Sequence, residues 1–309
     1  MPQLHPHVRA VMQEMQTDDP VAAVRAKARA LMGQFLEYFP GEPPFDVEAL
    51  ASFRGLKPSQ DSPRHSPDSE IAPENGQVVL RVNRDRPLVR QRFSIGHEVG
   101  HTLFPEFQLA VRCRKASDRD WADPSDQLES LCDVAASEFL FPSPWFEGEL
   151  RRVGVSATGV GELAARFSAS PEATIRRLVD VEQEPLAAMF CSWKLKPTEI
   201  RRVSADRHQS RMFEDPGGTP TPKLRVDYSI ANEEFRVKCC AHLPRDKSLP
   251  SDGPLLDAAT TQEPHDGFMW LDLGSVAGKF RVHAIPIFTE GDRVGPNGAV
   301  SVAVLIRPT

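Results

Sequence analysis

The sequence RFSIGHEVGHTL at residues 92–103 decides how the rest of the chain is interpreted. It contains the pattern HExxH, with His97 and His101 four positions apart. On a helix, such residues share one face, so both rings can direct a nitrogen at one metal ion. We therefore predict a helix over about 88–103 that carries two metal ligands. Its other positions are largely apolar, and they include Phe93, Ile95, Val99, Leu103 and Phe104.

The residues beside the histidines indicate a catalytic base and a closely packed neighbouring element. Glu98 lies to the side of the ligand pair, so it cannot easily be a ligand with them, but it can take a proton from a nearby water molecule. Metal-assisted hydrolysis of an amide needs such a base. Gly96 and Gly100 each cost the helix about 1 kcal/mol relative to alanine, which predicts close packing against a neighbouring element.

A catalytic zinc usually has three protein ligands and one open position. The next predicted helix, 125–140, supplies the third ligand, and Glu129 is the best candidate. Glu138, further along the same helix, is the weaker alternative. Asp133 shares a face with Glu129, and we expect it to accept a hydrogen bond from the outer nitrogen of a ligating histidine.

The first half of the chain is predicted to be rich in helices. Apolar residues recur at helical spacing over 20–38, and Asp19 before Pro20 is a favourable start signal. Further helices are predicted at 6–17, 46–53 and 143–152, and a strand is predicted at 77–83. Residues 58–76, which are rich in Pro, Ser, Asp and Glu, are expected to form a surface loop.

Two helices at 159–167 and 171–182 form a helix-turn-helix pattern. In a DNA-binding protein the second helix would present its N-terminal residues to the major groove. These residues would be Glu172, Thr174, Arg176 and Arg177. Because Glu172 is unfavourable next to phosphates, we prefer a helical packing module that supports the first part or grips a target.

The last third of the chain has β-type patterns. After the linker-like residues 201–222, such runs occur at 224–230, 235–241, 268–273, 280–288 and 299–306. Cys239, Cys240 and His242 resemble a metal site, but adjacent cysteines on a strand are more often one buried and one exposed. This region either senses a small molecule or is a structural or dimerisation domain.

Composition limits the class of protein. The formal net charge of −6 argues against a protein built mainly to hold nucleic acid. Five cysteines without a CxxC pair make a disulfide framework or a cysteine-type zinc site improbable. The N-terminus has no signal-peptide pattern, and no stretch approaches the roughly 20 apolar residues of a membrane helix. We expect a soluble, cytoplasmic protein that does not bind membranes.

Several motifs of this chain resemble the ImmA/IrrE family of bacterial metallopeptidases. Residues 92–101, RFSIGHEVGH, resemble its RxFTxAHExGH segment. Residues 45–51, FDVEALA, resemble its DVxxLA helix, and residues 129–142, ESLCDVAASEFLFP, resemble its ExEANxFAAELLMP helix. The resemblance covers about residues 20–145. Gly96 replaces the family's alanine and Asp133 replaces its asparagine, but neither change removes a ligand.

The resemblance implies a gluzincin-like fold with Glu129 as the third ligand. It also implies a site-specific metalloendopeptidase that cleaves a helix-turn-helix repressor of the XRE type and so de-represses a stress or DNA-damage response. Longer family members carry a helix-turn-helix unit and a GAF-like sensor. We therefore predict an α+β chain with a zinc peptidase domain at 1–148, a helix-turn-helix-like unit at 149–197 and a β-rich, GAF-like domain at 198–309.

The expected metal is zinc, although two histidines and a glutamate can also hold manganese. A rival interpretation is a transcription regulator that binds DNA or protein and has a structural or vestigial metal site. Glu98 discriminates between the two, since a purely structural site needs no carboxylate beside its ligands.

Overall fold

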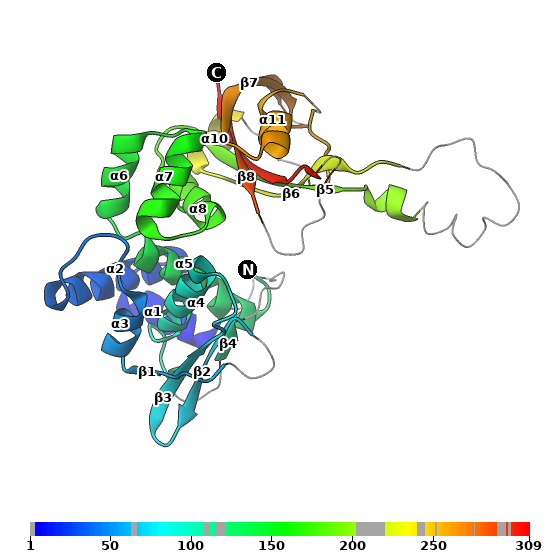
Figure 1. Cartoon of the computed structure of the whole chain (residues 1–309). Coiled ribbons are helices and arrows are strands. Elements are labelled where there is room, and N and C mark those ends of the chain that lie inside the picture. Colours follow the sequence, from blue (N-terminus) through cyan, green and yellow to red (C-terminus); the bar gives the residue numbers. More distant parts are fainter. Residues whose placement is uncertain are drawn as a thin grey trace, which may run out of the picture. The chain divides into compact units, whose positions relative to one another are not determined.

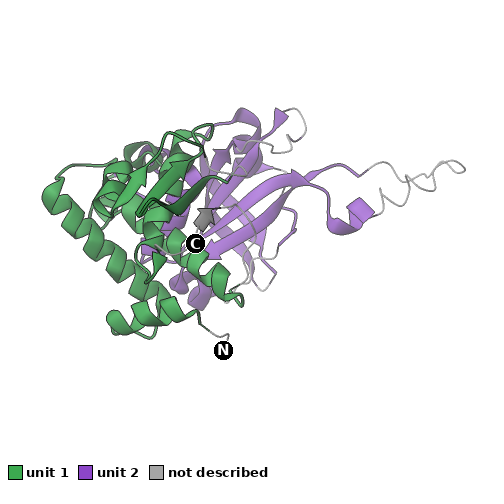
Figure 2. Ribbon diagram, turned by 90° about the horizontal axis from the view of Figure 1, so that it is seen from below, with its two compact units in different colours: residues 1–152, 163–170 green, residues 153–162, 171–309 purple. Residues whose placement is uncertain are grey.

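The computed structural model describes residues 4–62, 67–107, 112–114, 121–201, 220–239, 245–250, 252–274, 276–288, 295 and 298–309. The chain forms two compact units, coloured separately in Figure 2. The first comprises Met1–Arg152 and Leu163–Ser170, and the second comprises Val153–Glu162 and Pro171–Thr309. Both units contain helices and strands, which agrees with the mixed fold class that we predicted. The boundaries at 148 and 197 stay predictions.

In its described residues, the first unit combines helices with a small sheet (Figure 1). Its helices are α1 (Pro6–Glu14), α2 (Pro20–Tyr38), α3 (Val47–Phe53), α4 (Leu88–His101), α5 (Pro124–Leu140) and α6 (Trp145–Val153). Its strands are β1 (Leu56–Pro58), β2 (Ser69–Glu74), β3 (Gln77–Val82) and β4 (Arg112–Arg114). The predicted start of α2 is confirmed, because the side chain of Asp19 accepts a hydrogen bond of 2.8 Å from the amide of Val21.

Helices α4 and α5 pack against each other at very short range. A methyl group added at Gly100 would lie 3.0 Å from Cα of Cys132, and one added at Gly96 would lie 3.1 Å from Cδ1 of Leu140. Any larger residue would push the two backbones apart. The close packing predicted from these two glycines is confirmed, and α5 is the partner.

The sheet of the first unit has the strand order β1-β3-β2-β4, with β1 parallel to β3 and the other pairs antiparallel. Strand β2 corrects our prediction of a surface loop over 58–76. Its acidic residues are compatible with a strand because Arg81 of β3 pairs with Glu70 at 3.3 Å and with Glu74 at 2.7 Å. Composition alone suggested a loop, but the guanidinium of Arg81 compensates the negative charge of the two glutamates.

The second unit is built on one antiparallel sheet with the strand order β6-β5-β9-β8-β7. Its strands are β5 (Ala187–Lys194), β6 (Lys223–Ala231), β7 (His265–Asp272), β8 (Ala277–Ile287) and β9 (Ser301–Pro308). Its helices are α8 (Pro171–Val181), α10 (Glu233–Cys239) and α11 (Gly253–Thr261), while α7 (Ala157–Phe167) contributes residues to both units. One face of the sheet and helices α10 and α11 share a hydrophobic core, and α8 packs on β5, β6 and β8.

The predicted β-type run at 235–241 is wrong, because residues up to Cys239 form helix α10. Asn232 starts this helix by accepting a hydrogen bond of 3.0 Å from the amide of Phe235. Phe235 and Cys239, four positions apart, supply its buried face. Cys240 and His242 lie outside the described residues.

Among the described residues, no helix combines the length and hydropathy that a membrane span requires. The cytoplasmic location stays a prediction, as does the GAF-like assignment of the second unit.

Candidate metal centre

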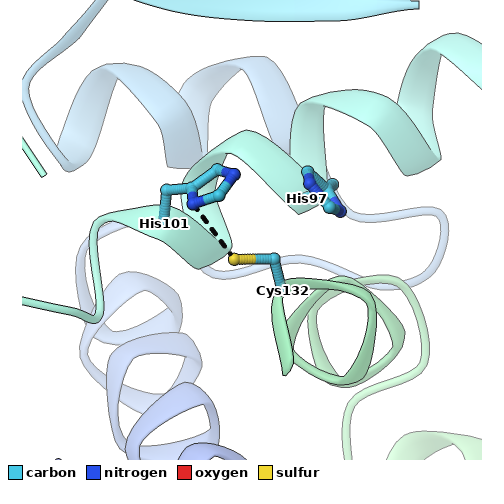
Figure 3. A group of neighbouring side chains, drawn as sticks. All are labelled: His97, His101 and Cys132. Atoms are coloured by element: carbon cyan, nitrogen blue, oxygen red, sulfur yellow. Dashed lines mark hydrogen bonds between the residues drawn. The ribbon is translucent and has the colours of Figure 1, made fainter. Parts of the chain in front are cut away.

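The two histidines of the HExxH pattern lie on the buried face of α4. The side chains of His97 and Glu98 are fully buried, and that of His101 is 2% exposed. Figure 3 shows both imidazoles above α5, with Cys132 beside His101. The ring centroids are 5.1 Å apart. Helical spacing therefore brings two imidazoles, which are common metal ligands, into one buried space.

Glu129 of α5 faces both rings. Its Oε2 lies 3.1 Å from Nε2 of His97, and its Oε1 lies 3.4 Å from Nε2 of His101. Two imidazole nitrogens and one carboxylate oxygen are the donor set of many catalytic zinc sites. The three residues predicted as ligands are thus brought together, and their donor atoms fit a zinc ion. Their assignment as ligands remains a proposal.

Each histidine also has a partner at its other nitrogen. Nδ1 of His97 lies 2.8 Å from Oδ1 of Asp133, the contact for which Asp133 was singled out in the sequence. Nδ1 of His101 lies 3.3 Å from Sγ of Cys132, as the dashed line in Figure 3 marks. Such contacts fix the tautomer and the orientation of a metal-binding ring. Sequence reasoning missed Cys132, although its position between Glu129 and Asp133 on one helix was a usable signal.

Cys132 also offers a second donor set. The donor atoms of His97, His101 and Cys132 lie within 4.8 Å of one another, so the thiolate is an alternative ligand. Glu129 fits better as the third ligand, because it faces Nε2 of both histidines while Cys132 contacts Nδ1 of one.

Glu98 is held by the neighbouring sheet. Its Oε1 accepts a hydrogen bond of 2.7 Å from the hydroxyl of Ser69 on β2. Its Oε2 lies 4.0 Å from Nε2 of His101. The carboxylate is therefore beside the predicted ligands, as a base that acts next to the metal must be.

The electrostatics of the site favour positive charge. Burial lowers the pKa of His97, but hydrogen bonds to Asp133 and Glu129 and the nearby charge of Glu98 outweigh it and raise the pKa to about 9. The same acidic groups that stabilise an imidazolium ion would stabilise a divalent cation. The acidic groups around His97 are therefore suited to stabilise a cation at this position.

Glu138 is not available as the alternative ligand. Its buried carboxylate pairs with Arg29 of α2 at 3.0 Å and with Arg25 at 3.8 Å. These contacts join α2 to α5, and they give Glu138 a role in packing.

The residues that a DNA-reading helix would present to the groove are buried or contact other residues of the second unit. Thr174 and Arg177 are buried, with relative exposures of 0% and 1%. The guanidinium of Arg176 lies 4.8 Å from the ring centroid of Tyr228, whose hydroxyl donates to Glu172. Helix α8 therefore uses this face to bind its own sheet, which favours the packing module that we preferred.

A buried HExxH helix, packed against a helix whose acidic side chain faces both histidines, is typical of metallopeptidase-type centres. Residues 53–179 match the family model of the IrrE N-terminal-like domain, peptidase family M78. This part of the chain is therefore similar to IrrE N-terminal-like peptidase domains, and the predicted resemblance to the ImmA/IrrE family is confirmed.

Two curated relatives extend the match over most of the chain. The radiation response metalloprotease IrrE of Deinococcus radiodurans is 26% identical over 258 residues, covering 83% of this chain and 73% of the relative. The radiation response metalloprotease IrrE of Deinococcus deserti is 25% identical over 245 residues, covering 79% and 78%. A solved Mycobacterium tuberculosis transcriptional regulator has a TM-score of 0.50 at 13% identity, over 97% of this chain and 79% of that chain, and it shows similarity of fold alone.

Proposed function

We propose that this protein is a zinc-dependent, site-specific endopeptidase that cleaves a helix-turn-helix repressor of the XRE type and thereby de-represses a stress or DNA-damage response. The observation that carries the proposal is the arrangement on α4 and α5. His97, His101 and Glu129 direct donor atoms at one buried position, and Glu98 lies beside them. The curated relatives, both named radiation response metalloproteases, support the same class of activity.

In the proposed mechanism, His97, His101 and Glu129 hold the metal, with Asp133 and Cys132 orienting the two rings. When bound, zinc supplies a Lewis acid that polarises the scissile carbonyl and acidifies water. Glu98 takes a proton from the attacking water and passes it to the amine nitrogen of the leaving peptide. Burial of Glu98 strengthens its electrostatic interaction with the reacting atoms.

The second unit is proposed to regulate the peptidase, as a GAF-like sensor would. Support comes from its separate compact fold and its own hydrophobic core, which indicate a distinct role. A small-molecule ligand for it stays a proposal, and so does the three-part division of the chain.

The rival function, DNA binding through the helix-turn-helix, is less well supported. Arg177 and Thr174 lie in the interior of the second unit, so reading a groove with them would require α8 to leave its sheet. We therefore keep a protein substrate as the primary partner.

The decisive experiment is co-expression of the wild type and Glu98→Gln with candidate helix-turn-helix repressors from the same genome, read by intact mass. A single pair of fragments with the wild type, absent with Glu98→Gln and with a chelator, would support the peptidase and identify the scissile bond. Intact repressors under metal-replete, stressed conditions, with zinc still bound, would favour the binding protein instead.

A further inference from the structure

Ser69 lies outside α4 and α5 and contacts the proposed base Glu98 directly. It lies on β2 and is fully buried. Its hydroxyl donates a hydrogen bond of 2.7 Å to Oε1 of Glu98, which is also fully buried. A hydrogen bond from a hydroxyl to an ionised carboxylate is charge-assisted and about twice as strong as a neutral one.

The backbone at Ser69 is anchored on both sides. The preceding residue, Asp68, binds Arg90 of α4 at 2.8 Å and Arg86 at 3.0 Å, so the start of β2 is tied to the helix that carries Glu98. The following residue, Glu70, pairs across the sheet with Arg81. These contacts place the hydroxyl of Ser69 at a fixed position relative to α4.

A glutamate carboxylate needs such an anchor, because rotation about its last torsion is soft and nearly two-fold. With Oε1 held by Ser69, the other oxygen is directed toward the ligands, 4.0 Å from Nε2 of His101. On the basis of the function proposed above, we propose that Ser69 is a positioning residue that keeps Oε2 of Glu98 ready to accept the proton of the attacking water.

Substitutions at Ser69 test this role in the full-length, zinc-loaded protein with the repressor that it cleaves. Ser69→Ala should lower kcat by about 10- to 100-fold with little change in KM, as expected when a group that orients a functional side chain is removed. Ser69→Thr, which keeps the hydroxyl, should restore most of kcat. Ser69→Cys, with a weak donor of similar size, should behave like Ser69→Ala.

A matched control lies on α4 itself. Ser94 is also fully buried, and its hydroxyl donates to the carbonyl of Arg90 at 2.8 Å, one turn earlier on the same helix. Ser94→Ala should therefore leave kcat close to the wild-type value. An equal loss of kcat in Ser94→Ala and Ser69→Ala would indicate a general packing effect and would overturn the inference.

A second readout needs no activity. In the metal-free protein, Ser69→Ala and Glu98→Ala should each lower Tm, and the double variant should lose less than the sum, because both single changes remove the same hydrogen bond. Zinc affinity, measured by competition with a chromophoric chelator, should not change in Ser69→Ala. Additive losses of Tm would overturn the inference.

These measurements separate the two proposals. If Glu98→Gln cleaves as fast as the wild type, the proposed function is wrong and the role of Ser69 is lost with it. If Glu98→Gln is inactive but Ser69→Ala keeps the wild-type kcat, the function stands and the inference about Ser69 is wrong.

Discussion

At the residue scale, Glu98 is the proposed base, and His97, His101 and Glu129 are the proposed metal ligands. Glu98→Gln keeps the shape of the side chain but removes its ability to accept a proton, so we expect the cleavage rate to fall by about 10²- to 10⁴-fold. Zinc affinity should change little, since Glu98 is not a proposed ligand. Intact-mass kinetics and a chelator competition measure the two effects. Glu37→Gln, an exposed change on α2, is the control and should keep full activity.

Cys132 gives a second prediction at this scale. Its Sγ contacts Nδ1 of His101, so Cys132→Ala should weaken zinc binding by roughly tenfold, whereas Cys132→Ser should keep most of the affinity through its hydroxyl. Cys239→Ala, a buried cysteine of the second unit, is the matched control and should not change zinc binding. Unchanged affinity in Cys132→Ala would show that the thiol does not orient the ring.

The sequence was sufficient to find the proposed base, the three proposed ligands and Asp133. His97 and His101, and again Glu129 and Asp133, are spaced by four, and helical geometry alone places each pair on one face. Ser69 and Cys132 were missed for different reasons. Ser69 reaches Glu98 only through tertiary contact with a strand that we did not predict. Cys132 entered the sequence analysis only as one of five cysteines without a CxxC pair, which argued against a cysteine-type zinc site.

At the element scale, the contact between α4 and α5 sets the distances within the site. Gly100→Ala should lower the free energy of unfolding of the metal-free protein by about 1–3 kcal/mol, because the new methyl group meets the backbone of Cys132 at 3.0 Å. Gly33→Ala, at an exposed position of α2 with nothing within 4 Å, should instead add about 0.5–1 kcal/mol. Urea denaturation measures both, and a Gly100→Ala protein as stable as the wild type would contradict the packing.

Long amphipathic helices were predicted well, because their periodicity and caps are local. Strand β5, AAMFCSWK, was missed, since a strand buried on both faces shows no alternation. Helix α10 was misassigned as a strand, since its short apolar run fits the helical repeat of 3.6 residues as well as the strand repeat of two. Strand β2 was not predicted because its segment is acidic. In the structure, Arg81 of β3 pairs with its two glutamates.

At the scale of the whole molecule, the proposed metal site belongs to one unit. All three proposed ligands lie on α4 and α5, so removal of zinc should accelerate hydrogen exchange in these helices and leave β7–β9 of the second unit unchanged. Mass spectrometry of exchanged peptides with and without a chelator measures this. Re-addition of zinc should reverse the change, and equal acceleration in both units would contradict the assignment.

The short approach of α4 and α5 at Gly100 also limits how the enzyme can be controlled. The backbones of the two helices are so close at Gly100 that sliding or rotation of one helix against the other would be opposed by steric contact. A regulatory signal is therefore not expected to act through small shifts of α4 against α5 that would change the distances between the proposed ligands. We therefore expect control of such a centre to act on the access of the peptide or on the supply of the metal, while α4 and α5 stay packed.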